Sequence, residues 1–260
     1  RDSIGRRLMA ATGELTADWR AAHPAVETGP ELLKRILVER QARWAAEPNN
    51  AGKRYKEPAD VDNSALSDLP EGWTWASLAQ ISFVSGGLTV DAKRKPSDPI
   101  ELPYLRVANV QRGHLDFTTI KSVIVDRSAV AGLALKAGDI LLNEGGDRDK
   151  VGRGWVYEGQ LPICLHQNHV FKARPASDAV SPFLISMYLN ELGRRFFLEQ
   201  GKQTTNLASI SLSKVSAAPL PIPPLSEAQE ILRVHAAHSS QSVDGELGDA
   251  IWAYLGILEI

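Results

Sequence analysis

Two histidines, His166 and His169, stand three residues apart in the segment HQNH and are the residues most suggestive of metal chemistry. Imidazoles at this spacing share one face of a helix, whereas on a strand they point to opposite faces. The flanking residues 162–165 and 170–171 favour a strand. We therefore expect hydrogen-bonding side chains in a loop or at a strand end. The alternative is a metal-dependent hydrolase centred on His166, His169 and Asp147, which metal analysis would test.

A second candidate is the charged segment NEGGDRDK at residues 143–150. Its carboxylates do not follow the spacing of an EF-hand, and no Gly-Lys-Ser/Thr of a phosphate-binding loop follows. We interpret it as a charged turn between strands that could serve in recognition. Its glycines let the backbone approach a ligand, and Arg148 and Lys150 offer hydrogen-bond donors.

Two segments are locally basic. Residues 86–112 carry two more basic than acidic side chains, and residues 194–214 carry three more. The second segment includes GKQTTN at 201–206, whose side chains are of the kinds that contact phosphate oxygens and base edges. Taken alone, such an excess is typical of a solvated surface.

The whole chain, by contrast, is close to neutral. Its 260 residues hold 29 Lys and Arg against 31 Asp and Glu, a formal net charge of −2, which argues against a coat held to DNA or membrane by charge alone. The hydrophobic fraction of 43% is that of an ordinary globular protein. The single cysteine, Cys164, excludes an internal disulfide and favours a reducing, cytoplasmic location. The longest apolar run, at 250–258, is about half of what a membrane span needs.

The elements that would position these residues fall into three zones. Residues 1–68 are expected to form a helical spacer and linker, with a helix at 31–44 signalled by Thr28 and Pro30 and a linker at 53–68. The predicted face of that helix consists of Leu33, Ile36, Leu37, Arg40 and Trp44.

Residues 69–224 are dominated by short, β-branched runs bounded by Gly and Asp, with helical periodicity at 182–200 and a helical turn at 77–81. The mixture predicts an α+β fold, with a twisted mixed β-sheet and packed helices flanked by spacer helices. The predicted strands are residues 104–110, 122–125, 140–142, 152–157 and 169–173.

The third zone, residues 225–260, follows the proline-rich segment 219–225, which cannot be a central strand or a helix. Ser226 is the expected N-cap of a helix at 227–238. Residues 239–260 show no clear pattern.

Five segments, in order, carry a resemblance to a known family. They are LPEGWTWASL at 69–78, PYLRVANVQRG at 103–113, KAGDILLNEGGD at 136–147, QNHV at 167–170 and PIPPLSEAQ at 221–229. Together they resemble one target recognition domain of a type I restriction-modification specificity (S) subunit. GELTADWR at 13–20 and the helix at 34–44 resemble the segment that precedes the second recognition domain, so the chain is similar to the C-terminal half of such a subunit.

The resemblance implies a DNA sequence-specificity module that is not itself an enzyme. Specificity subunits of this family carry two recognition domains separated by long antiparallel helices, and each domain reads one half of a bipartite duplex target. Modification (methyltransferase) subunits that use S-adenosylmethionine and restriction subunits that use ATP and magnesium are the implied partners. The chain has no Gly-x-Gly cofactor loop between strand and helix, no Asn-Pro-Pro-Tyr motif and no Walker sequence, so we expect no cofactor of its own.

The expected DNA contacts are polar side chains in loops. Arginine pairs best with guanine, and asparagine or glutamine with adenine. The candidates are Lys93, Arg94, Lys95, Asn143, Asp147, Arg148, Lys150, His166, Gln167, His169, Lys202, Gln203, Thr204, Thr205 and Asn206.

The chain departs from the family at its C-terminal end. Residues 235–244 break the long spacer pattern, which predicts a truncated or frameshifted distal helix. Half-length subunits that pair as dimers offer one alternative arrangement, with the apolar segment 251–255 as a surface for self-association or a partner. A further alternative is an orphan scaffold that binds only a protein partner.

Overall fold

The structure, a computed structural model, describes residues 8–90, 95–203, 207–239 and 251. Among these residues the strands form four small sheets interleaved with helices, so the α+β prediction is confirmed. One of the four sheets is mixed and the others are antiparallel. No helix in the described part of the chain is both long and apolar enough to cross a bilayer.

The N-terminal zone is built around α3 (Gly29–Ala46), preceded by α2 (Ala17–Ala22) and followed by η1 (Pro48–Asn50). The backbone N–H of Thr28 donates to Glu31 Oε2 at 2.8 Å, which caps the helix where Thr28 and Pro30 predicted a start. Of the predicted face, Ile36 is buried and Leu33 packs partly buried against the same core, while the buried Leu32 was not part of that prediction. Arg40 reaches the next zone, where its Nε donates to the Ala79 carbonyl at 2.9 Å.

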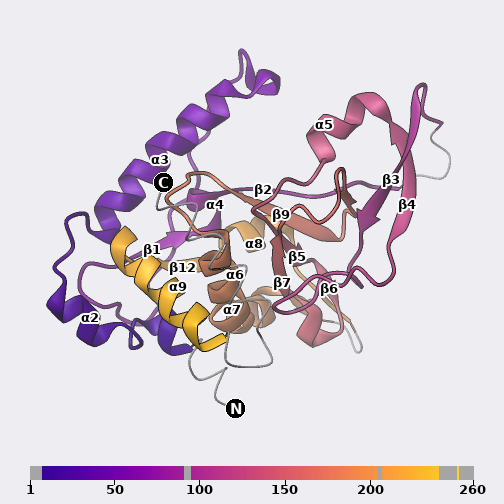
Figure 1. Ribbon diagram of the computed structural model, residues 1–260. Helices are drawn as coiled ribbons and strands as arrows, with labels where there is room; N and C mark the ends of the chain where they lie inside the picture. Colours follow the sequence, from indigo (N-terminus) through magenta and orange to yellow (C-terminus); the bar gives the residue numbers. More distant parts are fainter. Residues whose placement is uncertain (1–7, 91–94, 204–206, 240–250, 252–260) are drawn as a thin grey trace.

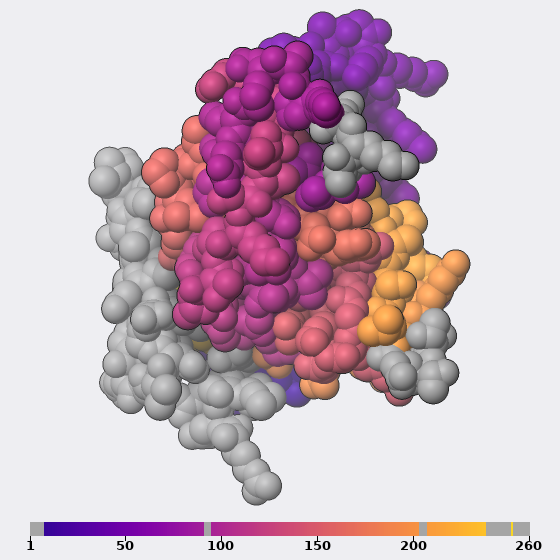
Figure 2. Space-filling view, turned by 90° about the vertical axis from the view of Figure 1, so that its right-hand side faces the viewer, coloured from indigo at the N-terminus to yellow at the C-terminus, as the bar shows by residue number. Residues whose placement is uncertain are grey.

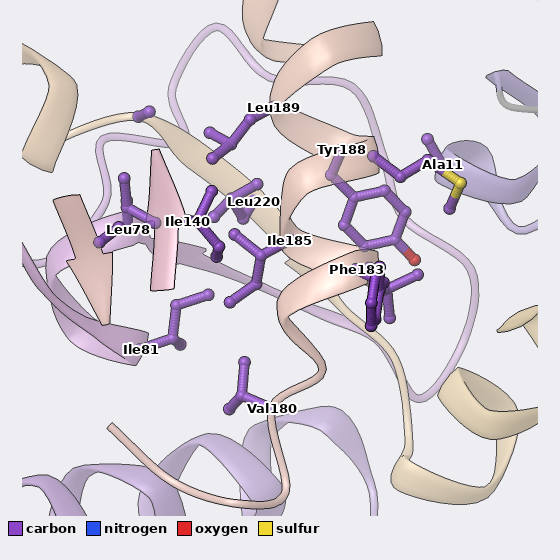
Figure 3. Packing of buried hydrophobic residues seen from close by; sticks show 14 of the residues in the cluster. Ala11, Leu78, Ile81, Ile140, Val180, Phe183, Ile185, Tyr188, Leu189 and Leu220 are labelled. Atoms are coloured by element: carbon purple, nitrogen blue, oxygen red, sulfur yellow. The ribbon is translucent and has the colours of Figure 1, made fainter. Parts of the chain in front are cut away.

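The central sheet has the order β2 (Ser82–Ser85), β9 (Val170–Pro175), β5 (Asp139–Asn143), β7 (Gly154–Tyr157), all antiparallel. Both faces of β5 are covered, so all five of its residues are buried. Ile140 belongs to the larger core, which includes the helix side chains Ile185 and Leu189 (Figure 3). Leu141 belongs to a second cluster on the other face of the strand.

A second sheet, in the order β4 (Lys121–Asp126), β3 (Pro99–Leu105), β8 (Leu165–His166), rises beside the first with η2 (Arg127–Ala129) and α5 (Val130–Leu133) (Figure 1). The predicted strand at 104–110 is wrong beyond Leu105. The Asn109 side chain accepts from the Arg106 N–H at 3.0 Å and donates to the carbonyls of Asp116 and Thr119. These bonds hold the backbone beyond Leu105 in a turn, in place of the hydrogen bonds between strands that an extended segment would make.

The predicted helix at 182–200 is two helices, α6 (Pro182–Glu191) and α7 (Gly193–Gln200). They meet where the buried Asn190 donates to the carbonyls of Gly154 and Ser186. Asn190 therefore ties the end of α6 to strand β7.

The start and end of the middle zone pair with each other. Strand β1 (Thr74–Ser77) runs antiparallel to the proline-rich β12 (Pro219–Ile222) in a two-stranded sheet, which agrees with the exclusion of β12 from a central position. The predicted turn at 77–81 is confirmed as α4 (Leu78–Ile81). The helix α9 (Leu225–Ser239) begins one residue before the N-cap predicted at Ser226.

One buried carboxylate joins all three zones. Glu227, in the first turn of α9, is 1% exposed and accepts hydrogen bonds from Thr16 Oγ1 at 2.7 Å, Arg20 Nη1 at 2.6 Å and Trp73 Nε1 at 2.8 Å. The N-terminal segment and α9 are thus packed together against the beginning of the middle zone. The boundaries at 68 and 224 stay predictions.

Candidate nucleic-acid interface

The charged turn and the second basic segment lie side by side. Strands β6 (Gly145–Gly146), β11 (Ala208–Ser209) and β10 (Lys202–Gln203) form a small antiparallel sheet in which Gly145 opposes Ser209 and Ser209 opposes Lys202. A β-carbon at Gly145 would lie 2.5 Å from the carbonyl of Ala208. Glycine is therefore what lets the two segments approach.

His169 joins the same group through Glu144. The Glu144 N–H donates to the His169 carbonyl at 2.9 Å, and His169 Nδ1 donates to Glu144 Oε2 at 2.5 Å. The Ile210 N–H donates to the Glu144 carbonyl at 2.9 Å, so Glu144 links the histidine turn to the segment after β11. Three polar segments from separate parts of the sequence thus meet at one end of the central sheet.

The loop that follows β2 begins at this group and ends far from it. The Leu88 N–H donates to the His166 carbonyl, and the Asn168 N–H donates to the Leu88 carbonyl. The chain then reaches the free tip of the β3–β4 ribbon, where Lys95 is exposed. Because β3 advances about 3.3 Å per residue, that tip lies roughly 20 Å from the histidine turn. The ribbon occupies the front of Figure 2 in magenta, with the pink residues near position 150 below it.

Two of the predicted contacts lie in the interior. Asn143 is 0% exposed and donates to the Val110 carbonyl at 2.9 Å, while His166 is 1% exposed and its Nδ1 donates to the Val170 carbonyl at 2.7 Å. Burial lowers the pKa of His166 to about 4, so its ring is neutral near pH 7. We exclude both side chains from the contact surface, since both hold strands and loops together inside the fold.

The other described candidates reach solvent. Lys150 Nζ donates to Asp147 Oδ2 at 2.5 Å, which lowers the pKa of that exposed carboxyl and keeps it charged. Arg148, His169 and Lys202 are exposed, and Gln167 is partly exposed. Five predicted contacts lie outside the described residues, as does the side chain of a sixth. They are Lys93, Arg94, Thr204, Thr205 and Asn206, with the side chain of Gln203.

The metal hydrolase alternative finds no support in this geometry. Within the described residues no group of three or more His, Cys, Asp or Glu side chains is placed to hold a metal ion. His166 faces the interior, whereas the His169 side chain is 56% exposed and paired with Glu144. Asp147 is instead paired with Lys150.

Two arginines behind the charged turn were missing from the sequence-based set of contacts. Arg112 Nη2 donates to the Asp149 carbonyl at 3.0 Å, and Arg153 Nε donates to the Val110 carbonyl at 3.2 Å. The turn that Arg112 supports contains η3 (Arg148–Lys150). Neither the type nor the spacing of these residues signals the role, because Arg112 lies 37 residues from its partner Asp149.

Polar loops meet at one end of the central sheet, and the buried side chains of Asn143 and His166 hold them from inside. Loops positioned by strands in this way are common where a protein binds a ligand.

Comparison with known proteins confirms the resemblance to type I restriction enzyme specificity subunits. The chain is 25% identical over 183 residues to the putative MjaX specificity subunit of Methanocaldococcus jannaschii, covering 69% of this chain and 42% of that protein. It is 24% identical over 220 residues to the EcoEI specificity subunit of Escherichia coli, covering 83% and 36%. The chain thus spans less than half the length of these relatives.

Among solved structures, the HsdS subunit from Thermoanaerobacter tengcongensis aligns with 97% of this chain and 57% of its own, at 18% identity and a TM-score of 0.46. No family model matches the chain.

Proposed function

We propose that this chain is a DNA sequence-specificity module that reads one half of a bipartite duplex target. The observation that carries the proposal is the convergence of the turn at 143–150, the turn around His169 and the strand pair β10–β11 at one sheet end. The naming of its relatives as specificity subunits supports it.

The chemistry of the exposed side chains fits the reading of base edges. Arg148 and Lys150 can donate to guanine, Gln167 can bond adenine in a bidentate way, and Asp147 can accept from the amino group of cytosine. Each well-formed bidentate contact discriminates by about 1–3 kcal/mol.

The module, on this proposal, performs no catalysis itself. Modification subunits supply S-adenosylmethionine-dependent methylation, and restriction subunits supply ATP- and magnesium-dependent cleavage. Residues 69–224 form the recognition domain, residues 1–68 are spacer and linker, and residues 225–260 begin a distal spacer. The pairing of β1 with β12, which closes the middle zone on itself, supports these boundaries. The buried free thiol of Cys164 is in keeping with a cytoplasmic location.

Selection from a randomised duplex library tests the proposal. We expect the chain, alone or with its modification subunit, to enrich a short sequence with a nanomolar to micromolar affinity that falls with salt. Arg148→Gln should reduce discrimination at one base pair by about 1–3 kcal/mol, because it removes a bidentate donor from an exposed turn.

Arg233→Gln provides the matched control, since Arg233 is exposed on α9 and paired with Glu230. It should leave the selected sequence unchanged. Equal affinity for every duplex, with the modification subunit present, would contradict the proposal. Binding of that subunit without any DNA preference would instead identify an orphan scaffold.

A further inference from the structure

The junction of α6 and α7 holds a guanidinium group between a helix and the charged turn. Arg112 Nη1 donates to the Asn190 carbonyl at 2.9 Å and to Asn190 Oδ1 at 3.3 Å, while its Nη2 donates to the Asp149 carbonyl at 3.0 Å. Arg112 therefore spans the gap between the end of α6 and the turn, and it fixes the backbone of the turn at Asp149.

A second guanidinium, that of Arg153 directly before β7, lies near the same turn. The Arg153 side chain is 12% exposed, its Nε donates to the Val110 carbonyl, and its Nη1 lies 3.9 Å from Asp149 Oδ2. Both arginines thus direct their hydrogen bonds mainly to carbonyl oxygens. A carbonyl orients a guanidinium without neutralising its charge.

A third arginine completes the cluster. Arg194 is exposed in the first turn of α7, four residues after Asn190, the residue that Arg112 holds. Burial lowers the pKa of Arg112, and the charges of Arg194 and Arg153 lower it further, so both cations act on Arg112. Asp149 and Glu191 oppose this effect, which leaves one positive charge in excess among the five groups.

We propose that Arg112, Arg153 and Arg194, named here the elbow cluster, bind a phosphate of the DNA backbone beside the recognition turn. The inference rests on the proposed function and extends it to side chains that touch no base. A phosphodiester carries one negative charge, which matches the excess, and arginine forks suit its oxygens. Arg112 and Arg153 are anchored and partly buried, so they cannot extend into a groove and serve to set the register of the duplex.

The salt dependence of duplex binding separates this role from base reading. We expect Arg194→Gln to weaken binding of selected and unrelated duplexes by the same factor. It should also reduce the slope of log affinity against log salt by about 0.9, the value for one phosphate contact. Arg195→Gln is the matched control, because it removes the same charge from the same helix. Arg195 is 87% exposed and already paired with Glu199 at 2.6 Å, so the slope should not change.

A second variant acts in the opposite direction. Asp149→Asn keeps the carbonyl that Arg112 holds but removes a 62% exposed carboxylate that would repel the phosphate. We expect it to tighten binding to all duplexes without changing the selected sequence. Circular dichroism of each variant confirms that the fold is retained.

The outcomes distinguish the two proposals. If the wild-type chain selects a sequence but Arg194→Gln and Arg195→Gln have the same salt slope as wild type, phosphate binding by the elbow cluster is overturned. The proposed specificity function then stands. If the chain binds every duplex equally and Arg194→Gln still lowers the slope, the elbow cluster stands and sequence reading fails. The absence of binding to any duplex, with the modification subunit present, overturns both.

Discussion

At the scale of the residue, His166 shows how a side chain that suggests chemistry can serve structure instead. Its Nδ1 must carry the proton, because the Val170 carbonyl can only accept. Its Nε2 is buried and has no hydrogen-bond partner among the described residues. A charged ring there would face the nearby cations Lys172 and Arg174, in addition to the loss of water. His166 is therefore suited to the neutral form alone.

The low pKa of His166 predicts a loss of stability in mild acid. The ordinary value of 6.5 in the unfolded chain falls to about 4 in the folded protein, so the unfolded state binds the proton first. The free energy of unfolding should decline as the pH falls from about 6.5 towards 4, by up to roughly 3 kcal/mol. Urea unfolding at pH 7 and pH 5 measures this decline.

His166→Asn removes the titration while an amide N–H can still donate to the Val170 carbonyl. The variant should be less stable than wild type at pH 7 and show a smaller difference between pH 7 and pH 5. An unchanged difference would mean that another group causes the acid sensitivity.

Among single polar residues, we expect replacement of Glu227 to have the largest effect on the free energy of unfolding. Replacement by alanine leaves Thr16 and Trp73 without their acceptor and leaves Arg20 without its counter-ion. We expect Glu227→Ala to lower the free energy of unfolding by about 3 kcal/mol, within the range for breaking a buried ion pair. Glu199→Ala, which breaks the exposed pair with Arg195, should cost less than about 1 kcal/mol. Equal effects in urea unfolding would contradict the bridging role of Glu227.

At the scale of the element, the predictions from the sequence are right where neighbouring residues decide the backbone conformation. They are wrong where contacts between residues far apart in the sequence decide it. The strands at 122–125 and 140–142 were predicted because β-branched and aliphatic residues favour extended backbone locally. The strand predicted at 104–110 fails because Asn109 binds carbonyls 7 and 10 residues away. The helix at 182–200 divides where Asn190 bonds to β7, a contact that periodicity does not encode.

The pairing of β6 with β11 in the small sheet can be tested by a substitution at Gly145. Gly145→Ala places a β-carbon against the Ala208 carbonyl, so β6 must move away from β11. We expect faster amide hydrogen exchange at residues 145–150 and 207–210, and weaker sequence preference in the duplex selection.

Gly132→Ala is the control for this element. Gly132 lies in α5, and beyond its own helix no heavy atom of the described residues lies within 4 Å of the position that an alanine β-carbon would take, so alanine should be neutral or slightly stabilising. Normal exchange around 145–150 in Gly145→Ala would show that the contact is relieved without separating the strands.

At the scale of the whole molecule, the net charge of −2 and the proposed DNA contact are compatible. Several of the basic residues concerned are on loops at one end of the central sheet or at the junction of α6 and α7, while carboxylates such as Glu227 and Asp139 lie inside the fold. A near-neutral chain can thus present a basic surface locally. Neutrality excludes only binding that depends on charge alone.

The sequence by itself determined the α+β class, most element positions, the polar character of the loops and the resemblance to specificity subunits. Each depends on local periodicity, turn-forming residues or short motifs. Only the tertiary structure decided that Asn143 and His166 are internal, that Glu144 joins three segments, and that Arg112 and Arg153 stand behind the charged turn. The reason is that burial and strand pairing join residues far apart in the chain, and no local pattern encodes which of them meet.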